Sequence, residues 1–144
     1  MNQNTASRDE FQIPRKLTND LLHLAQLSPD AEICGLVGSL DGIPCSCYPV
    51  VNIADQPMRR FLLDAKQQID AMAAMRAKGE DLFAIYHSHP SSPAEPSVHD
   101  IEEATYNDAL YLIISLNTKG VLEMRGFKIN QNTAQEVILT LLEK

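Results

Sequence analysis

The chain has 144 residues, which suits one domain, and its 44% hydrophobic and 22% charged residues are ordinary for a globular protein. Twelve basic against nineteen acidic side chains give a net charge of -7, so nucleic acid is not expected as a partner. The longest apolar run, residues 109–116, is far shorter than the roughly 20 residues of a membrane-spanning helix, so no membrane is expected either.

Residues 1–12 are polar and predict a flexible leader that lacks the apolar core of an export signal. The single domain is therefore expected over residues 13–144. The three cysteines, an odd number, indicate reduced thiols in the cytoplasm rather than a disulfide framework: Cys34, Cys45 and Cys47.

The first half of the domain predicts a helix followed by a hairpin. The helix begins near Pro14, and three leucines recur on one of its faces: Leu17, Leu21 and Leu24. Residues 32–40 and 43–53 predict two strands. Asp41-Gly42 between them is a strong signal for the turn of a β-hairpin.

A second helix is expected over residues 65–78, with Asp64 as its N-cap and Gly79 as its stop. Three of its residues are expected to be buried: Ile69, Met72 and Ala73. Residues 82–86 then predict a buried strand, and a short helix begins near Ser97. Two further strands are expected over residues 111–116 and 121–129, with a turn at 117–120 between them. Residues 136–142 fit either a strand or a helix, so the pattern is that of one α/β domain with a mixed sheet.

The chemistry is carried by His87-Ser-His-Pro90 and, six residues later, Ser97-Val-His-Asp100. Alternate residues of a strand point to the same side, so His87 and His89 can present two imidazoles to one point. The loop between the two motifs holds two further prolines and is short and stiff. It can bring Asp100, in the first turn of a helix that Ser97 caps, back to both histidines.

Two imidazoles and one carboxylate form the three-ligand set of a catalytic zinc site, which keeps one position open. We therefore predict that His87, His89 and Asp100 bind Zn²⁺. Other zinc signatures are absent, including H-E-x-x-H on a helix. His99 lies about 100° around the helix from Asp100 and is predicted to stay outside the ligand set.

Glu32 opens a predicted strand that otherwise holds apolar and small residues. A carboxylate at this position is costly unless it faces a site or the surface. Because hydrolysis at a metal site needs a base, Glu32 is the candidate. On the residues alone, a solvated glutamate at a strand end is the alternative.

Taken together, three segments resemble the JAMM (MPN-plus) zinc metallopeptidases, and their compact prokaryotic branch in particular: Glu32-Ile-Cys-Gly-Leu-Val-Gly38, His87-Ser-His-Pro90 and Ser97-x-x-Asp100. The resemblance implies a single domain with a mixed curved sheet flanked by helices, similar to cytidine deaminases. It also implies zinc on His87, His89 and Asp100, Glu32 as general acid and base, and Ser97 as a stabiliser of the oxyanion.

The same resemblance implies cleavage after the C-terminal Gly-Gly of a ubiquitin-like or sulfur-carrier protein. The sequence is similar in style to enzymes that release cysteine from a sulfur carrier. Removal of a bacterial ubiquitin-like modifier from proteins and a non-catalytic MPN scaffold remain the alternatives. The oligomeric state stays open, with a homodimer among the possibilities.

Overall fold

Seven strands form one mixed sheet in the computed structural model, which describes residues 8–117 and 122–143. The described elements follow in chain order: β1 Glu10–Pro14, α1 Arg15–Gln26, β2 Cys34–Leu40, β3 Ile43–Val50, α2 Ala65–Lys78, β4 Asp81–His89, α3 Val98–Glu103, β5 Leu110–Ser115, β6 Glu123–Asn130 and β7 Thr133–Leu142. The strand order across the sheet is β1-β7-β6-β5-β4-β2-β3. Two neighbouring pairs, β1–β7 and β4–β5, are parallel and the others are antiparallel. The predicted α/β domain with a mixed sheet is confirmed.

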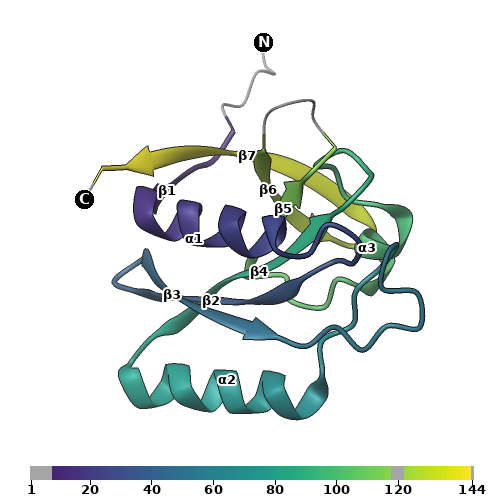
Figure 1. The fold of residues 1–144 in the computed structure, drawn as a ribbon. Helices are drawn as coiled ribbons and strands as arrows, with labels where there is room; N and C mark the ends of the chain where they lie inside the picture. Colours follow the sequence, from purple (N-terminus) through teal and green to yellow (C-terminus); the bar gives the residue numbers. More distant parts are fainter. Residues whose placement is uncertain (1–7, 118–121, 144) are drawn as a thin grey trace.

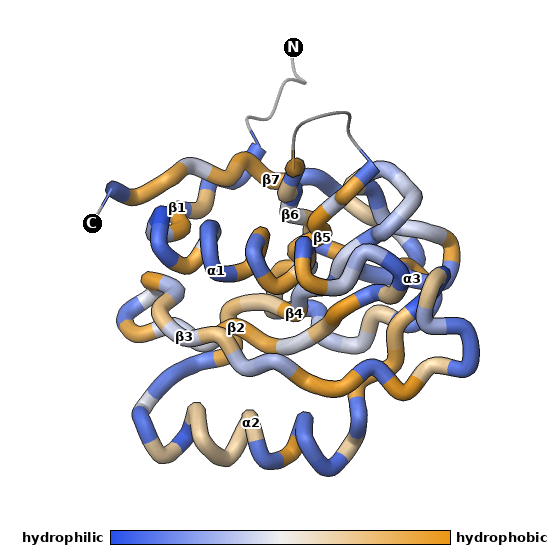
Figure 2. Tube along the Cα trace, in the orientation of Figure 1, coloured by the Kyte–Doolittle hydropathy of each residue, from blue (hydrophilic) through white to orange (hydrophobic). Residues whose placement is uncertain are grey.

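The sheet is strongly curved, because β1 and β3, at its opposite ends, contact each other. Helix α1 lies inside the curve and α2 covers the outer face (Figure 1). Each helix packs on its own cluster of buried side chains, one containing Leu21 and the other Met75. In Figure 2 hydrophobic colours run along much of the sheet, whereas both helices alternate hydrophobic and hydrophilic residues. None of the described helices is long and apolar enough to cross a membrane.

Strand β4 lies inside the sheet between β2 and β5, and both of its faces are buried. Ala84 and Tyr86 belong to the cluster around α1, whereas Ile85 belongs to the cluster around α2. Because side chains alternate along a strand, His87 and His89 share the face of Ile85. The sheet therefore directs both imidazoles to the side that carries α2 and α3.

The turn of the hairpin and the two ends of the second helix are confirmed as the sequence predicted them. Asp41 and Gly42 both have positive φ, 52° and 81°, which is the geometry of a two-residue type I′ turn between β2 and β3. The side chain of Asp64 caps α2 by accepting a hydrogen bond from the Gln67 amide. Gly79 ends α2 in the left-handed conformation.

The predicted leader is wrong over residues 10–12. These residues belong to β1, which pairs in parallel with β7 from Glu10↔Ile138 to Pro14↔Leu142. Ile13 is only 1% exposed and joins the core around α1. A polar strand at the sheet edge needs few apolar residues, so composition alone did not reveal it. Residues 1–7 lie outside the described part of the chain.

The predicted buried face of α2 is also wrong. Ile69 is 65% exposed, Ala73 is exposed and Met72 is half-buried, whereas Ala71 and Met75 are buried. The helix is therefore rotated so that a small residue, Ala71, lies against the sheet. The three cysteines are unpaired, as predicted, but only Cys34 is buried.

The last part of the chain settles one open alternative. Residues 136–142, which fit a strand or a helix, belong to β7. The turn predicted at 117–120 falls almost wholly on residues 118–121, which lie outside the described part of the chain.

Candidate metal centre

Three donor atoms from β4 and α3 lie within hydrogen-bonding distance of one another. His87 Nε2 and His89 Nε2 are 3.2 Å apart, and Asp100 Oδ2 lies 3.1 Å from each of them. A tetrahedral zinc with ligands at about 2.0–2.1 Å places its donors about 3.3 Å apart. The triangle thus has the size that one metal ion would give it.

The hydrogen bond on the far side of the His89 ring fixes its tautomer. His89 Nδ1 lies 2.7 Å from the carbonyl oxygen of Pro93, which only accepts, so Nδ1 carries the proton. In the neutral ring Nε2 then offers a lone pair to the centre of the triangle. This arrangement, with the outer N–H held by a carbonyl, is typical of histidines that ligate metals.

A capping box holds Asp100 in place at the start of α3. The Asp100 amide donates to Ser97 Oγ at 3.1 Å, and the Ser97 amide donates to Asp100 Oδ2 at 2.9 Å. The same oxygen therefore faces both histidines and the Ser97 amide. The predicted cap by Ser97 is confirmed, and it orients the carboxylate toward β4.

Burial and hydrogen bonds set the charge states of the three groups. Burial opposes ionisation of Asp100, but hydrogen bonds from His87, His89 and the Ser97 amide outweigh it and hold its pKa well below the usual range. Burial lowers the pKa of His87 and so favours its neutral form. Burial acts in the same direction on His89, but its bonds to Asp100 and Pro93 raise its pKa. A carboxylate beside two basic nitrogens is an anionic site for a cation.

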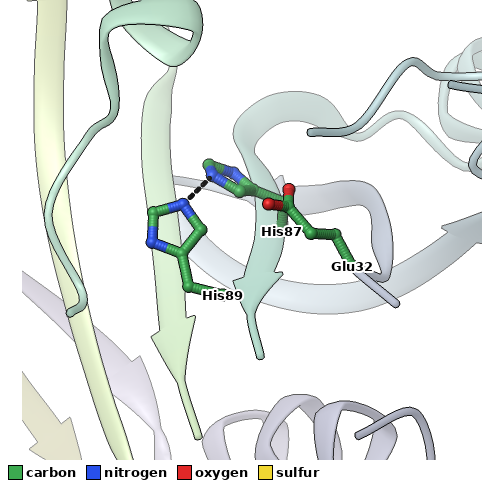
Figure 3. Close-up of side chains that lie close together, drawn as sticks. All are labelled: Glu32, His87 and His89. Atoms are coloured by element: carbon green, nitrogen blue, oxygen red, sulfur yellow. Dashed lines mark hydrogen bonds between the residues drawn. The ribbon is translucent and has the colours of Figure 1, made fainter. Parts of the chain in front are cut away.

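Glu32 lies just before β2 and points toward the two imidazoles (Figure 3). One atom each from Glu32, His87 and His89 lie within 4.8 Å of one another. Glu32 is only 4% exposed, and its Oε1 has no hydrogen-bond partner among the described residues. Burial raises its pKa to about 8. Because an unpaired buried carboxylate is costly, its position indicates that it faces a cation or a reacting group.

Backbone hydrogen bonds hold Glu32 from three directions. Its amide donates to the Pro57 carbonyl at 2.7 Å, and Asn52 Nδ2 donates to its carbonyl at 3.0 Å. The next amide, that of Ile33, donates to Ser88 Oγ at 2.9 Å. Ser88 stands between the two histidines in the sequence, so the same short segment that carries the imidazoles also positions Glu32.

Sequence reasoning missed the wall of the site, which residues 51–63 form. The strand expected over 43–53 ends at Val50, and Asn52 instead bridges to Leu63. The ring of Phe61 stacks on His87, with centroids 4.3 Å apart and planes 22° apart. An asparagine that interrupts an apolar strand pattern was the available signal, because its amide serves irregular backbone well.

His99 is exposed and makes no hydrogen bond with the three donors among the described residues. Its Nε2 lies 3.2 Å from Arg60 Nη2, on the wall just described. The structure thus brings together Glu32, His87, His89 and Asp100, with Ser97 beside them, and leaves His99 outside. The donor set, the His89 tautomer and the unpaired buried carboxylate all fit a divalent metal ion.

The family of prokaryotic homologues of the JAB domain matches residues 14–128, which is most of the chain. The chain belongs to this family. Its curated relatives include a desampylase from Haloferax volcanii, 37% identical over 60% of the chain and 64% of the relative. A probable TtuB-protein conjugate cleaving protease from Thermus thermophilus is 38% identical over 65% of the chain and 58% of the relative. The chain therefore spans less than two thirds of the length of these two proteins.

A CysO-cysteine peptidase from Mycobacterium tuberculosis is 28% identical to this chain. The matched region covers 89% of this chain and 88% of the relative. Among solved structures, a protein from Desulfitobacterium hafniense has a TM-score of 0.83 at 30% identity, covering 93% of this chain and 94% of that protein. A JAB1/MPN domain protein from Archaeoglobus fulgidus has a TM-score of 0.58 at 18% identity and covers 97% and 100%. The expected MPN fold is thereby confirmed.

Proposed function

We propose that this JAB-family protein is a zinc-dependent peptidase that cleaves the peptide or isopeptide bond after the C-terminal Gly-Gly of a ubiquitin-like or sulfur-carrier protein. The observation that carries the proposal is the triangle of two imidazole nitrogens and one carboxylate oxygen with sides of 3.1–3.2 Å. The buried carboxylate of Glu32 beside it supplies the group that a hydrolase needs. The names of the relatives support the class of substrate.

In this proposal His87, His89 and Asp100 hold Zn²⁺. Zinc bound there supplies a Lewis acid that acidifies water and polarises the carbonyl of the cleaved bond. Glu32 takes the proton of the attacking water and returns it to the leaving amine. Burial raises the pKa of this carboxyl and a zinc ion beside it would lower the pKa again, so the carboxyl can take up and return a proton near neutral pH.

Ser97 is proposed to stabilise the negative charge that develops on the carbonyl oxygen. Its Oγ accepts the Asp100 amide proton, and a hydroxyl keeps its own proton free to donate. The cap therefore fixes where the hydroxyl stands without using its donor. Removal of one such donor typically costs about 10²–10³ in turnover.

The relatives leave two candidate reactions. The cysteine-releasing reaction is favoured because the CysO-cysteine peptidase matches along 88% of its length. Deconjugation of a modifier is the second candidate, supported by 37% identity to the desampylase. A non-catalytic scaffold is disfavoured, since the four polar groups of the site all converge. The three unpaired cysteines support a reducing, cytoplasmic location.

Incubation of the zinc-loaded protein with a carrier fusion that ends in Gly-Gly-X, followed by intact mass, tests the proposal. The wild type is expected to release X, whereas Glu32→Gln binds zinc but loses turnover by several orders of magnitude. A fusion with Val in place of the penultimate Gly should resist cleavage, because a Cβ would widen the tail next to the zinc. Cleavage of unfolded casein at a comparable rate would instead show a general peptidase.

A further inference from the structure

A cavity of about 210 Å³ opens beside the metal donors, between α3, α2 and the sheet. Asp100 and Phe61 belong to its lining. Both also belong to the metal centre, since Asp100 faces the two histidines and Phe61 stacks on His87. The cavity therefore borders the metal centre at these two residues.

The walls of the cavity are apolar in character. Its lining includes leucine side chains and two tyrosines, Tyr106 and Tyr111, whose hydroxyl groups are engaged in the wall. Tyr111 Oη accepts the amide protons of Thr105 and Tyr106, each at 3.1 Å. Gln68 Nε2 donates to Tyr106 Oη. Both tyrosine oxygens are thus occupied by hydrogen bonds within the protein, and the exposed lining is mostly apolar, so the cavity suits an apolar ligand.

The size and floor of the cavity suit a single side chain. Pockets for drug-sized molecules measure about 300–1,000 Å³, more than this cavity offers. Its floor is formed by Ile85 of β4 and Tyr111 of β5, which are 1% and 4% exposed. These two buried side chains form the side of the cavity that faces the sheet.

We propose that this cavity receives the apolar side chain of the residue that cleavage releases. The inference rests on the proposed function, in which the residue before the cleaved bond is glycine and has no side chain. The cavity borders Asp100, so the side chain that fills it is expected to belong to a residue next to the cleaved bond. The glycine before that bond has no side chain, which leaves the released residue.

This assignment separates two kinds of substrate. An amino acid joined through its α-amine can place its whole side chain in the cavity and end there. The aliphatic chain of a lysine in an isopeptide bond must instead lead on to its own protein, so it gains less from a cavity of about 210 Å³. Glu103, exposed and part of the lining, adds a negative charge that disfavours acidic side chains. The preferred substrate is thus a linear Gly-Gly-X with an uncharged, apolar X, a class that includes cysteine.

The test is a matched series of Gly-Gly-X carrier fusions in which X is Leu, Ala or Asp, assayed with the zinc-loaded full chain. We expect kcat/KM for Leu to exceed that for Ala by about tenfold, and Asp to be slowest. Ala104→Leu fills the cavity and should reduce the Leu-to-Ala ratio to about one. Ala73→Leu, the same change on the exposed side of α2, is the control and should keep the wild-type ratio.

A second variant guards against misfolding of Ala104→Leu. Leu62 lines the cavity but is 53% exposed, so Leu62→Ala should fold normally and still lower the ratio. Equal wild-type rates for the three fusions would overturn the pocket while leaving the peptidase intact. An isopeptide-linked lysine cleaved faster than the Leu fusion would also overturn it. Absence of cleavage in the whole series would overturn both the pocket and the proposed function.

Discussion

Asn52 is the residue that ties the wall of the site to Glu32. Its Nδ2 donates to the carbonyls of Glu32 and Arg60, and its Oδ1 accepts the amides of Ala54 and Leu62. All of the hydrogen-bonding capacity of one amide is thus used to join residues 54–62 to the backbone of Glu32. Asn52 is therefore one of the three groups that position Glu32, and the one that links it to the wall.

Asn52→Ala should therefore lower turnover more than it lowers metal binding. Displacement of a catalytic group by about 1 Å can cost about 10²-fold in rate, and we expect a loss of this order in kcat. Zinc content, measured by elemental analysis, should stay at the wild-type level because none of the three donors touches Asn52. Asn130→Ala, at an exposed position, is the control. A normal kcat for Asn52→Ala would show that Glu32 needs no such support.

Metal binding itself is predicted to depend on three side chains and not on a fourth. His87→Ala, His89→Ala and Asp100→Ala should each reduce bound zinc sharply, because each removes one of the three donors. His99→Ala should keep full zinc, since His99 faces Arg60 instead. Elemental analysis of the purified variants decides the matter. Full zinc in all three donor variants would refute the assignment.

For single residues, the spacing of H-x-H and S-x-x-D was enough to predict that three donor atoms lie close together. Strand alternation aligned His87 with His89, and helix capping placed Asp100. Asn52 and Phe61 could not be predicted in the same way. They reach the site through the path of residues 51–63, which no local pattern determines.

Among the elements, Glu80 links β3 to the start of β4. Its carboxylate accepts hydrogen bonds from Tyr48 Oη at 2.7 Å and Ser46 Oγ at 2.8 Å, both on β3. Gly38 of β2 leaves the space for it, since a Cβ there would lie 2.2 Å from Glu80 Oε1. The carboxylate thus occupies a gap that only glycine provides.

The pH dependence of stability should report this link. Burial alone would raise the pKa of Glu80, but the bonds from Tyr48 and Ser46 outweigh it, so the pKa lies below its usual value. A lowered pKa stabilises the fold above the unfolded-state pKa, and the stabilisation is lost as the pH falls through the folded-state value. Glu80→Gln should cost about 1–2 kcal/mol at neutral pH.

The difference in free energy of unfolding between wild type and Glu80→Gln should shrink as the pH falls below about 4.3, the usual pKa of glutamate. Urea unfolding across the acid range measures it. Glu102→Gln, an exposed change on α3, is the control and should show no such gap. A gap that stays constant with pH would mean that the ionised form of Glu80 is not the stabilising one.

The bounds of α2 could be predicted, but not the face on which it packs. Asp64 and Gly79 signal the ends of the helix through local hydrogen bonds and backbone conformation, which the sequence carries. The buried face depends on how the helix meets a curved sheet. Small Ala71 lies against the sheet and leaves Ile69 in solvent, which periodicity alone did not reveal.

In the molecule as a whole, the sheet is so curved that β1, at one of its edges, contributes to the core. β1 pairs with β7 at one edge and contacts β3 from the other edge, so it closes the space that holds α1. This long-range contact cannot be predicted from a polar segment at the start of the chain. It explains why residues 10–12 belong to the fold.

The same substitution at two isoleucines tests this account. Ile13→Ala removes a side chain that is 1% exposed in the core around α1 and should cost about 2–5 kcal/mol of unfolding free energy. Ile69→Ala removes one that is 65% exposed on α2 and should change stability by no more than about 0.5 kcal/mol. Because β1 lies far from the metal donors in the strand order, the zinc content of folded Ile13→Ala should stay normal. Equal losses of stability for both variants would mean that β1 does not close the core.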